Sequence, residues 1–175
     1  PRSIGVSNFN QEHLERVLEA SSTVPAVNQI ELHPLLQQRE LTAFGEALGI
    51  RTEAWGPLGQ GKVDLAVEAP VLAGIAEAHG ATLAQAVLAW HLAEGRIIFP
   101  KSTRPERMRE NLAAIDVRLN ADEVAAIAAV DQNRRLATVL FYFYGARGEL
   151  HGCCPSAPAR RSSDGDLVAV ETQPC

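Results

Sequence analysis

The chain of 175 residues has few cysteines, few aromatic residues and no long hydrophobic run. Its cysteines, Cys153, Cys154 and Cys175, lie near the C-terminus, and an adjacent pair with an odd third makes a poor disulfide framework. The cysteine-free body therefore favours a cytoplasmic location. No stretch reaches the roughly 18 apolar residues that a membrane helix needs, and no signal peptide is visible. The formal net charge of -5 gives no reason to expect nucleic acid as a partner.

Hydrophobic periodicity predicts strands that alternate with helices. Strands are predicted at residues 2–6, 26–30, 50–54 and 96–99, and helices after Asn10 and at residues 39–48, 71–78, 83–93, 105–115 and 121–130. Helix caps are predicted at Asn10, Thr82, Asn120 and either Ser102 or Thr103, and Gly49 is predicted to end a helix. Repeated strand–helix units imply an α/β fold with a parallel sheet. The pattern fits half of an eight-stranded (β/α)8 barrel and also a small doubly wound sheet.

The character of the sequence changes beyond Asn133. Residues 136–144 form a continuous apolar and aromatic run with high strand propensity, which is an aggregation hazard. The residues after this run show no period. We therefore predict one domain over residues 1–133 and a disordered tail, foreign to the fold, over residues 134–175.

Basic side chains gather where a predicted strand ends and a helix begins. Lys101, Arg104 and Arg107 flank Pro105 in this segment. Free backbone N–H groups at a helix start attract anions, and arginine suits phosphate by its forked geometry. From the segment alone, a phosphate clamp and an ordinary solvated helix start are both open.

Polar or aromatic residues also lie at the ends of three of the predicted strands. Ser7, Asn8 and Gln29 could hold an amide ligand, and equally could serve loop and cap hydrogen bonds. Trp55 could stack on a flat ligand or belong to the core, whereas Trp90 on a predicted helix indicates a core residue.

His33 precedes Pro34 in a predicted loop. No second ligand stands at metal spacing, so we expect a structural histidine and no metal site. The sequence contains no Gly-rich phosphate loop and no nucleophile-elbow motif.

Several long stretches, taken in order, resemble the C-terminal half of the aldo-keto reductases, with the strongest likeness to the bacterial 2,5-diketo-D-gluconate reductases. They are Ile4-Gly5-Val6-Ser7-Asn8-Phe9, Val24-Pro25-Ala26-Val27-Asn28-Gln29-Ile30-Glu31-Leu32-His33-Pro34, Trp55-Gly56-Pro57-Leu58-Gly59-Gln60-Gly61-Lys62 and Phe99-Pro100-Lys101-Ser102. The resemblance covers about residues 2–132. It implies the last four units of a (β/α)8 TIM barrel and an NADP-dependent oxidoreductase. That family reduces aldehydes or ketones, such as diketo-gluconate, to alcohols.

The resemblance also implies roles for individual residues toward NADP(H). Ser7, Asn8 and Gln29 would hold the nicotinamide carboxamide, and Trp55 would stack on the ring, where most relatives outside this branch carry tyrosine. The residues implied to line the pyrophosphate path are Gly56, Leu58 and Gln60. Those implied to surround the adenosine ribose and its 2′-phosphate are Lys101, Ser102, Thr103, Arg104 and Arg107, and those implied to face the adenine are Glu110 and Asn111.

The family's catalytic Asp, Tyr, Lys and His lie on the first four barrel strands, and the resemblance begins at the fifth. Tyr142 and Tyr144 belong to the predicted tail and are no replacements, and neither is His33, so we predict no catalytic residue in this chain. Half a barrel would leave open sheet edges and an exposed apolar inner face, which predict self-association or a need for a complementary half. The alternatives are a non-catalytic half-barrel that binds nucleotide or anion, and a fragment or misassembled reading frame without a function of its own.

Overall fold

The structure, a computed structural model, describes residues 2–136, 142–144 and 150–152. The chain divides into two compact units, Pro1–Ala137 and Thr138–Cys175. In the second unit, β5 (Tyr142–Tyr144) pairs with β6 (Leu150–Gly152) in an antiparallel ladder. These strands differ from the disordered tail predicted for residues 134–175, whose other residues beyond Leu136 lie outside the described part, the cysteines among them.

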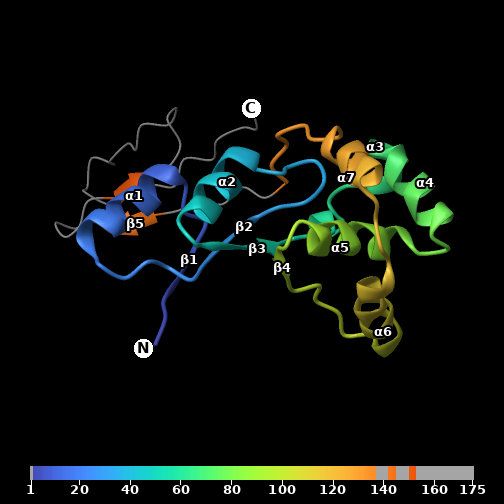
Figure 1. Cartoon of the computed structure of the whole chain (residues 1–175), viewed down its shortest axis with the longest axis horizontal. Coiled ribbons are helices and arrows are strands. Elements are labelled where there is room, and N and C mark those ends of the chain that lie inside the picture. The colour runs from blue at the N-terminus through green and yellow to red at the C-terminus, as the bar shows by residue number, and fades with distance from the viewer. Residues whose placement is uncertain (1, 137–141, 145–149, 153–175) are drawn as a thin grey trace, which may run out of the picture. The chain divides into compact units, whose positions relative to one another are not determined.

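Four parallel strands form the sheet of the first unit, and their order in space follows their order in the chain (Figure 1). They are β1 (Gly5–Ser7), β2 (Val27–Glu31), β3 (Arg51–Trp55) and β4 (Ile97–Ile98). A doubly wound sheet reverses its strand order at a switch point, whereas a barrel adds each strand beside the one before. The sequential order therefore confirms a segment of barrel type and rules out the doubly wound alternative for this sheet.

Except for the short α3, which was not predicted, the helices lie close to their predicted ranges. Their bounds are α1 (Gln11–Ala20), α2 (Arg39–Ala47), α3 (Leu65–Glu68), α4 (Pro70–Ala78), α5 (Leu83–Ala93), α6 (Pro105–Ala113) and α7 (Ala121–Ala128), with 3-10 turns η1 (Gly59–Gly61) and η2 (Ala114–Asp116). The predicted caps at Asn10, Thr82 and Asn120 are confirmed, because each accepts the backbone N–H three residues on in a capping box. Gly49 follows α2 with φ +77°, the left-handed backbone that glycine adopts freely.

The predicted cap of α6 is wrong. Arg104 is the N-cap residue, and no side chain caps the helix. The Ser102 hydroxyl instead accepts the Arg104 N–H at 3.1 Å and so closes a turn just before the helix. Pro105 holds the first helical position, as predicted.

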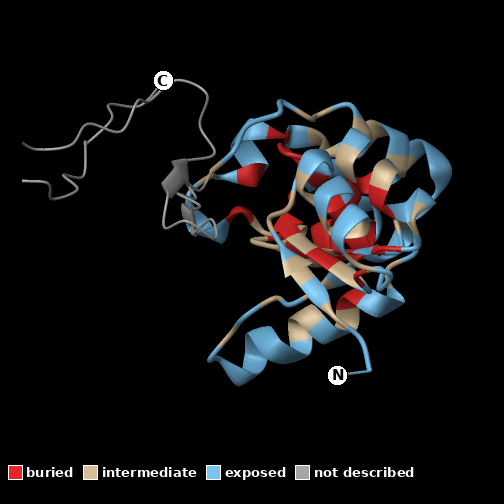
Figure 2. Cartoon of the chain, turned by 90° about the vertical axis from the view of Figure 1, so that its left-hand side faces the viewer, coloured by how far each residue is buried: buried red, intermediate tan, exposed pale blue. Residues whose placement is uncertain are grey.

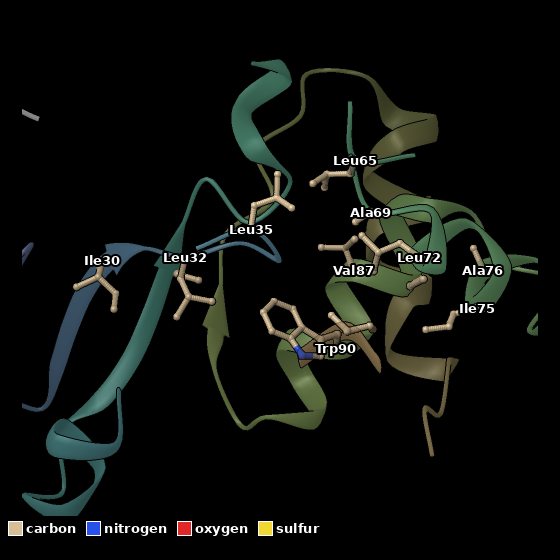
Figure 3. Packing of buried hydrophobic residues seen from close by; sticks show 13 residues of the cluster. Ile30, Leu32, Leu35, Leu65, Ala69, Leu72, Ile75, Ala76, Val87 and Trp90 are labelled. Carbon is tan, nitrogen blue, oxygen red and sulfur yellow. The ribbon is translucent and has the colours of Figure 1, made fainter. Parts of the chain in front are cut away.

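The hydrophobic core packs against one face of the sheet. Ile30 of β2 and Ala54 of β3 belong to a buried cluster that also contains side chains of α3, α4, α5 and α7, and Figure 3 labels ten of its members. Trp90 is fully buried in this cluster, which confirms its predicted core role, and the Arg96 guanidinium lies 4.5 Å from its ring centroid. Burying each large apolar side chain contributes roughly 1.5–3 kcal/mol.

The other face of the sheet carries side chains that alternate with the core residues along each strand. The side chains on this face belong to Ser7, Gln29, Glu31, Glu53 and Trp55, and Glu31 is the buried one among them. The predicted exposed apolar inner face is therefore wrong at these positions, because polar residues dominate them. Buried residues gather instead in the strands and in the helix faces turned toward them (Figure 2).

In the described part of the chain, no single helix is long and apolar enough to cross a membrane, and α4 and α5 pass that test only as a pair bent by 91°.

Candidate functional site

Polar side chains of three neighbouring strands meet at the carboxyl end of the sheet. Ser7 ends β1, Gln29 lies opposite it in β2, and Glu53 lies opposite Gln29 in β3. The Ser7 hydroxyl donates to the Gln29 carbonyl at 3.2 Å, and the Gln29 amide N–H donates to the Glu53 carboxylate. Barrel enzymes place their ligands at this end of the strands.

Asn8 connects this row to Trp55. Its backbone is left-handed, with φ +59°, a conformation that asparagine tolerates better than most residues. Its backbone N–H donates to the Gln29 carbonyl at 2.7 Å, and its side-chain N–H donates to the Ser7 hydroxyl at 3.1 Å. Its side-chain oxygen accepts the Trp55 indole N–H at 2.7 Å. The structure therefore brings together Ser7, Asn8, Gln29 and Trp55, here called the amide end.

Two supporting residues of the amide end escaped prediction from the sequence. Glu53 holds the Gln29 amide, and its position two residues before Trp55 on the same strand was a usable signal. Asn28 is buried and clamps the loop after Asn8, because it accepts the Phe9 N–H at 3.3 Å and donates to the Phe9 carbonyl at 2.8 Å. A polar residue two positions before the core-facing Ile30, and so on the same face of the strand, could have indicated this role.

The loop after Trp55 turns sharply through residues of positive φ. Gly56 has φ +64°, and a Cβ there would lie 3.3 Å from the Gln60 side chain, so the position favours glycine. Gln60 is exposed, whereas Leu58 is half-buried and packs against the core. The predicted contacts of these residues with a pyrophosphate stay a prediction.

His91 supports this loop from the core. Its Nε2–H donates to the Pro57 carbonyl at 3.4 Å. Burial, reinforced by the Arg96 charge and opposed by that hydrogen bond, lowers the pKa of His91 to about 3. The imidazole is therefore neutral at physiological pH. A pocket of ≈ 420 Å³ is lined in part by Leu58, Lys62 and Leu83 and does not include the amide end.

The basic residues lie at the start of α6. Lys101, Arg104 and Arg107, here called the basic end, are exposed, and no ion pair among the described residues involves them. Ser102 and Thr103 lie between them in the chain. The helix N-terminus adds its own positive partial charge. Unpaired cations beside free backbone N–H groups suit a phosphate.

Glu110 and Asn111 anchor α6 to its neighbours. The Thr82 hydroxyl donates to the Glu110 carboxylate at 2.6 Å, and the Gln85 amide donates to the Glu110 carbonyl at 3.1 Å. The Asn111 amide donates to the Pro100 carbonyl at 3.5 Å. Both side chains thus have structural partners, and their predicted contact with an adenine stays a prediction.

A buried carboxylate at the end of β2 anchors the segment that follows α7. Glu31 is 1% exposed and accepts the Arg135 guanidinium at 3.2 Å and the Leu136 N–H at 2.7 Å. His33 donates to it at 3.4 Å, and burial lowers the pKa of His33 although Glu31 opposes this. His33 is thus the structural histidine that the sequence predicts. Arg134 also donates its N–H to the Leu35 carbonyl at 2.9 Å, so three residues assigned to the predicted tail belong to the first unit.

No cluster of three or more His, Cys, Asp or Glu side chains suited to a metal ion occurs in the described residues.

One barrel segment carries both a hydrogen-bonded group of hydroxyl, amide and indole side chains and a basic helix start. Residues 2–132 match the model of the Aldo/keto reductase family. The chain belongs to the aldo-keto reductase family. The prediction of the family and of its TIM-barrel fold is thereby confirmed.

Similar proteins include other aldo-keto reductases. The methylglyoxal reductase DkgA of Salmonella typhimurium is 45% identical over 135 residues, which cover 77% of this chain and 49% of that relative. A solved mutant of Gox0644 in complex with NADPH is 51% identical with a TM-score of 0.69, and the match covers 74% of this chain and 47% of that one. A solved Bombyx mori aldo-keto reductase in complex with NADP is 34% identical with a TM-score of 0.72, and the match covers 79% and 47%.

This aldo-keto reductase chain spans about half the length of the relatives it matches. Solved relatives hold NADPH or NADP, as the sequence predicts for the family. The residues described here fit such a group, because hydroxyl and amide side chains meet at the amide end and three unpaired cations stand at the basic end.

Proposed function

We propose that this chain provides the NADP(H)-binding part of an NADP-dependent aldo-keto reductase, which reduces an aldehyde or ketone to an alcohol. The observation that carries the proposal is the hydrogen-bonded meeting of Ser7, Asn8, Gln29 and Trp55 at the carboxyl end of adjacent parallel strands. The exposed, unpaired basic end supports a preference for NADP over NAD, because only NADP carries the additional phosphate.

Each group of residues has a proposed task. The amide end binds and orients the carboxamide, and the ring of Trp55 covers one face of the nicotinamide. The residues proposed for the pyrophosphate are Gly56, Leu58 and Gln60, and those proposed for the adenosine half are Lys101, Ser102, Thr103, Arg104, Arg107, Glu110 and Asn111. When bound, NADPH supplies the hydride for the carbonyl carbon. The substrate class proposed is a small carbonyl compound, in keeping with the name of the reductase DkgA.

Reduction of a carbonyl to an alcohol also needs a proton donor. The family's proton donor is a tyrosine by the resemblance, and the two tyrosines of the chain, Tyr142 and Tyr144, both follow the matched residues. We therefore propose that this polypeptide binds NADPH without reducing a carbonyl by itself. Turnover of NADPH with methylglyoxal or another small dicarbonyl above a no-protein control would contradict this.

Titration of the purified chain with NADPH, followed by nucleotide fluorescence, tests the binding proposal. We expect saturable binding that NADP competes for more strongly than NAD does. Equal competition by both nucleotides would remove the proposed role of the basic end, and absence of any binding would overturn the proposed function.

A non-catalytic half-barrel that associates with itself is the second candidate, and two observations favour it. The sheet among the described residues ends at β1 and β4 without a further strand on their outer sides. Large apolar side chains are exposed on or just after β4, on α6, which has no buried residue, and on η2: Ile97, Phe99, Met108, Leu112 and Ile115. Open edges and apolar patches favour association. Sedimentation analysis of the wild type and a Leu112→Glu variant tests this candidate, which predicts a dimer or larger species that the variant weakens.

A further inference from the structure

The hydrogen bond between Trp55 and Asn8 has a fixed direction. An indole N–H can only donate, so the Asn8 atom that lies 2.7 Å from it is the amide oxygen. The Asn8 nitrogen must then point the other way. A flipped amide would place two donors against each other at this distance, which is strongly unfavourable.

The other end of the same chain of hydrogen bonds is fixed as well. The Asn8 nitrogen donates to the Ser7 hydroxyl at 3.1 Å, and that hydroxyl donates to the Gln29 carbonyl at 3.2 Å. A backbone carbonyl can only accept. The donor at Trp55 and the acceptor at Gln29 therefore set one direction for the whole chain of bonds.

This direction decides what Asn8 offers to a ligand. Its amide nitrogen carries two hydrogens, and one of them is used by Ser7. Its oxygen is taken by Trp55. The group left over on the half-buried Asn8 is therefore an N–H donor, which suits a carbonyl oxygen and disfavours an N–H group of the ligand.

The backbone holds both partners in place. Asn8 is fixed in its left-handed conformation by the bond from its N–H to the Gln29 carbonyl. Trp55 ends β3, lies opposite Glu31 in the ladder, and its carbonyl accepts the Leu32 N–H at 3.2 Å. The main chain at both residues is therefore fixed, and the bond between the two side chains forms across this fixed frame.

We propose that Trp55 is a positioning residue that sets the donor–acceptor polarity of Asn8, so that Asn8 presents an N–H to the carboxamide oxygen of the nicotinamide. This rests on the proposed function and adds a task to Trp55 beyond covering the ring. Tyrosine at this position would not impose the same polarity, because a phenol hydroxyl both donates and accepts.

The first test needs no nucleotide. The chain holds two tryptophans, so its isotope-labelled form gives two indole N–H resonances by NMR, and Trp55→Phe identifies the one from Trp55. Asn8→Gly keeps the positive φ and removes the acceptor. We expect it to shift the Trp55 resonance upfield and to speed its exchange with water about tenfold or more.

Asn8→Asp keeps an acceptor, and Ser7→Ala leaves the Trp55 bond alone, so both should preserve the resonance. An unchanged Trp55 resonance in Asn8→Gly would overturn the proposal.

The second test asks what Asn8 offers to the cofactor. An acetylpyridine analogue of NADP keeps the carbonyl oxygen and replaces the amide nitrogen by a methyl group. Asn8→Asp keeps the bond from Trp55 and loses the N–H donor, so it should weaken binding of NADP and of the analogue about tenfold each, with their affinity ratio unchanged. Trp55→Phe removes the donor that fixes Asn8, so Asn8 can turn its oxygen to the amide nitrogen of NADP, and binding of the analogue should weaken more than binding of NADP. A variant Asn8→Asp that discriminates against one nucleotide only would contradict the assigned polarity.

The two tests separate the possible failures. If the wild-type chain binds no NADPH, the proposed function fails while the NMR result still decides the bond between Trp55 and Asn8. If NADPH binds and Asn8→Gly leaves the Trp55 resonance unchanged, the polarity proposal alone fails.

Discussion

The amide end and the basic end of the candidate site are built in opposite ways. At the amide end, half-buried or exposed side chains form a chain of directed hydrogen bonds of 2.7 to 3.2 Å that ends at the Gln29 backbone carbonyl. At the basic end, exposed cations have no ion-pair partner among the described residues. Directed bonds select a ligand by its shape and polarity, whereas solvated charges select it by charge and are screened by salt. The two ends should therefore respond differently to mutation, to salt and to the choice of nucleotide.

Charge reversal at the basic end should have the largest effect. The double variant Lys101→Glu and Arg107→Glu should weaken NADPH binding about 100-fold, because charge-assisted bonds to phosphate contribute about 1.5–3 kcal/mol each. Binding of NADH should change little, since it lacks the additional phosphate. Fluorescence titration with both nucleotides measures this, and Arg16→Glu on the exposed side of α1 is the matched control. Equal losses of affinity for NADPH and NADH would contradict the proposed difference between the two ends.

Acid should act on the loop that follows the amide end. His91 has a pKa of about 3 in the folded chain against an ordinary value of 6.5, so between these values only the unfolded chain binds the proton. The free energy of unfolding therefore falls as pH drops below the unfolded value, by up to about 1.4 kcal/mol per pH unit. Between pH 7 and pH 5, wild type should lose about 2 kcal/mol more than His91→Gln does. Urea unfolding at the two pH values measures the difference, and parallel losses would rule out His91 as the cause.

Removal of one amide should affect both nucleotides alike. Gln29→Leu should weaken NADPH and NADH about tenfold each, the worth of one or two neutral hydrogen bonds. The loss should be the same at low and high salt, unlike that of the charge reversal. Titrations at two salt concentrations check this. A strongly salt-dependent loss would mean that the amide end also acts through charge.

Loosening the contact that holds α6 should have the smallest effect. Thr82→Ala removes the cap of α5 and the 2.6 Å bond to Glu110, and should lower the free energy of unfolding by about 1 kcal/mol. NADPH binding should fall less than threefold, because the basic side chains themselves remain. Thr82→Ser keeps the hydroxyl and should restore both values. Thermal unfolding and NADPH titration provide the measurements.

Local signals explain which parts of the fold were predictable. The helix Leu83–Ala93 matches its predicted range because Thr82 and Gln85 define its start within a few residues. The cap of α6 was misjudged because a short polar residue such as Ser102 serves a turn as readily as a cap. Arg134, Arg135 and Leu136 seemed foreign to the fold because their partners, Leu35 and Glu31, are far away in the sequence.

The residues of the site could be predicted from the sequence, but the hydrogen bonds that join them could not. Ser7, Asn8, Gln29 and Trp55 follow from the resemblance, and parallel pairing brings them together. The positive φ of Asn8 and the Trp55 indole bond depend on the angle at which two chain segments approach each other. The spacing of apolar residues along the sequence does not specify that angle.

The two faces of the sheet are under different evolutionary constraints. Ile30 and Ala54 face the packed interior, whereas their strand neighbours Gln29, Glu53 and Trp55 face the opposite way. Exchanges on that second side need not create a cavity, so new ligand preferences can be acquired there at little cost to folding. A library randomised at Gln29, Glu53 and Trp55 should consequently retain many folded members. The same number of changes at their core-facing strand neighbours should retain few.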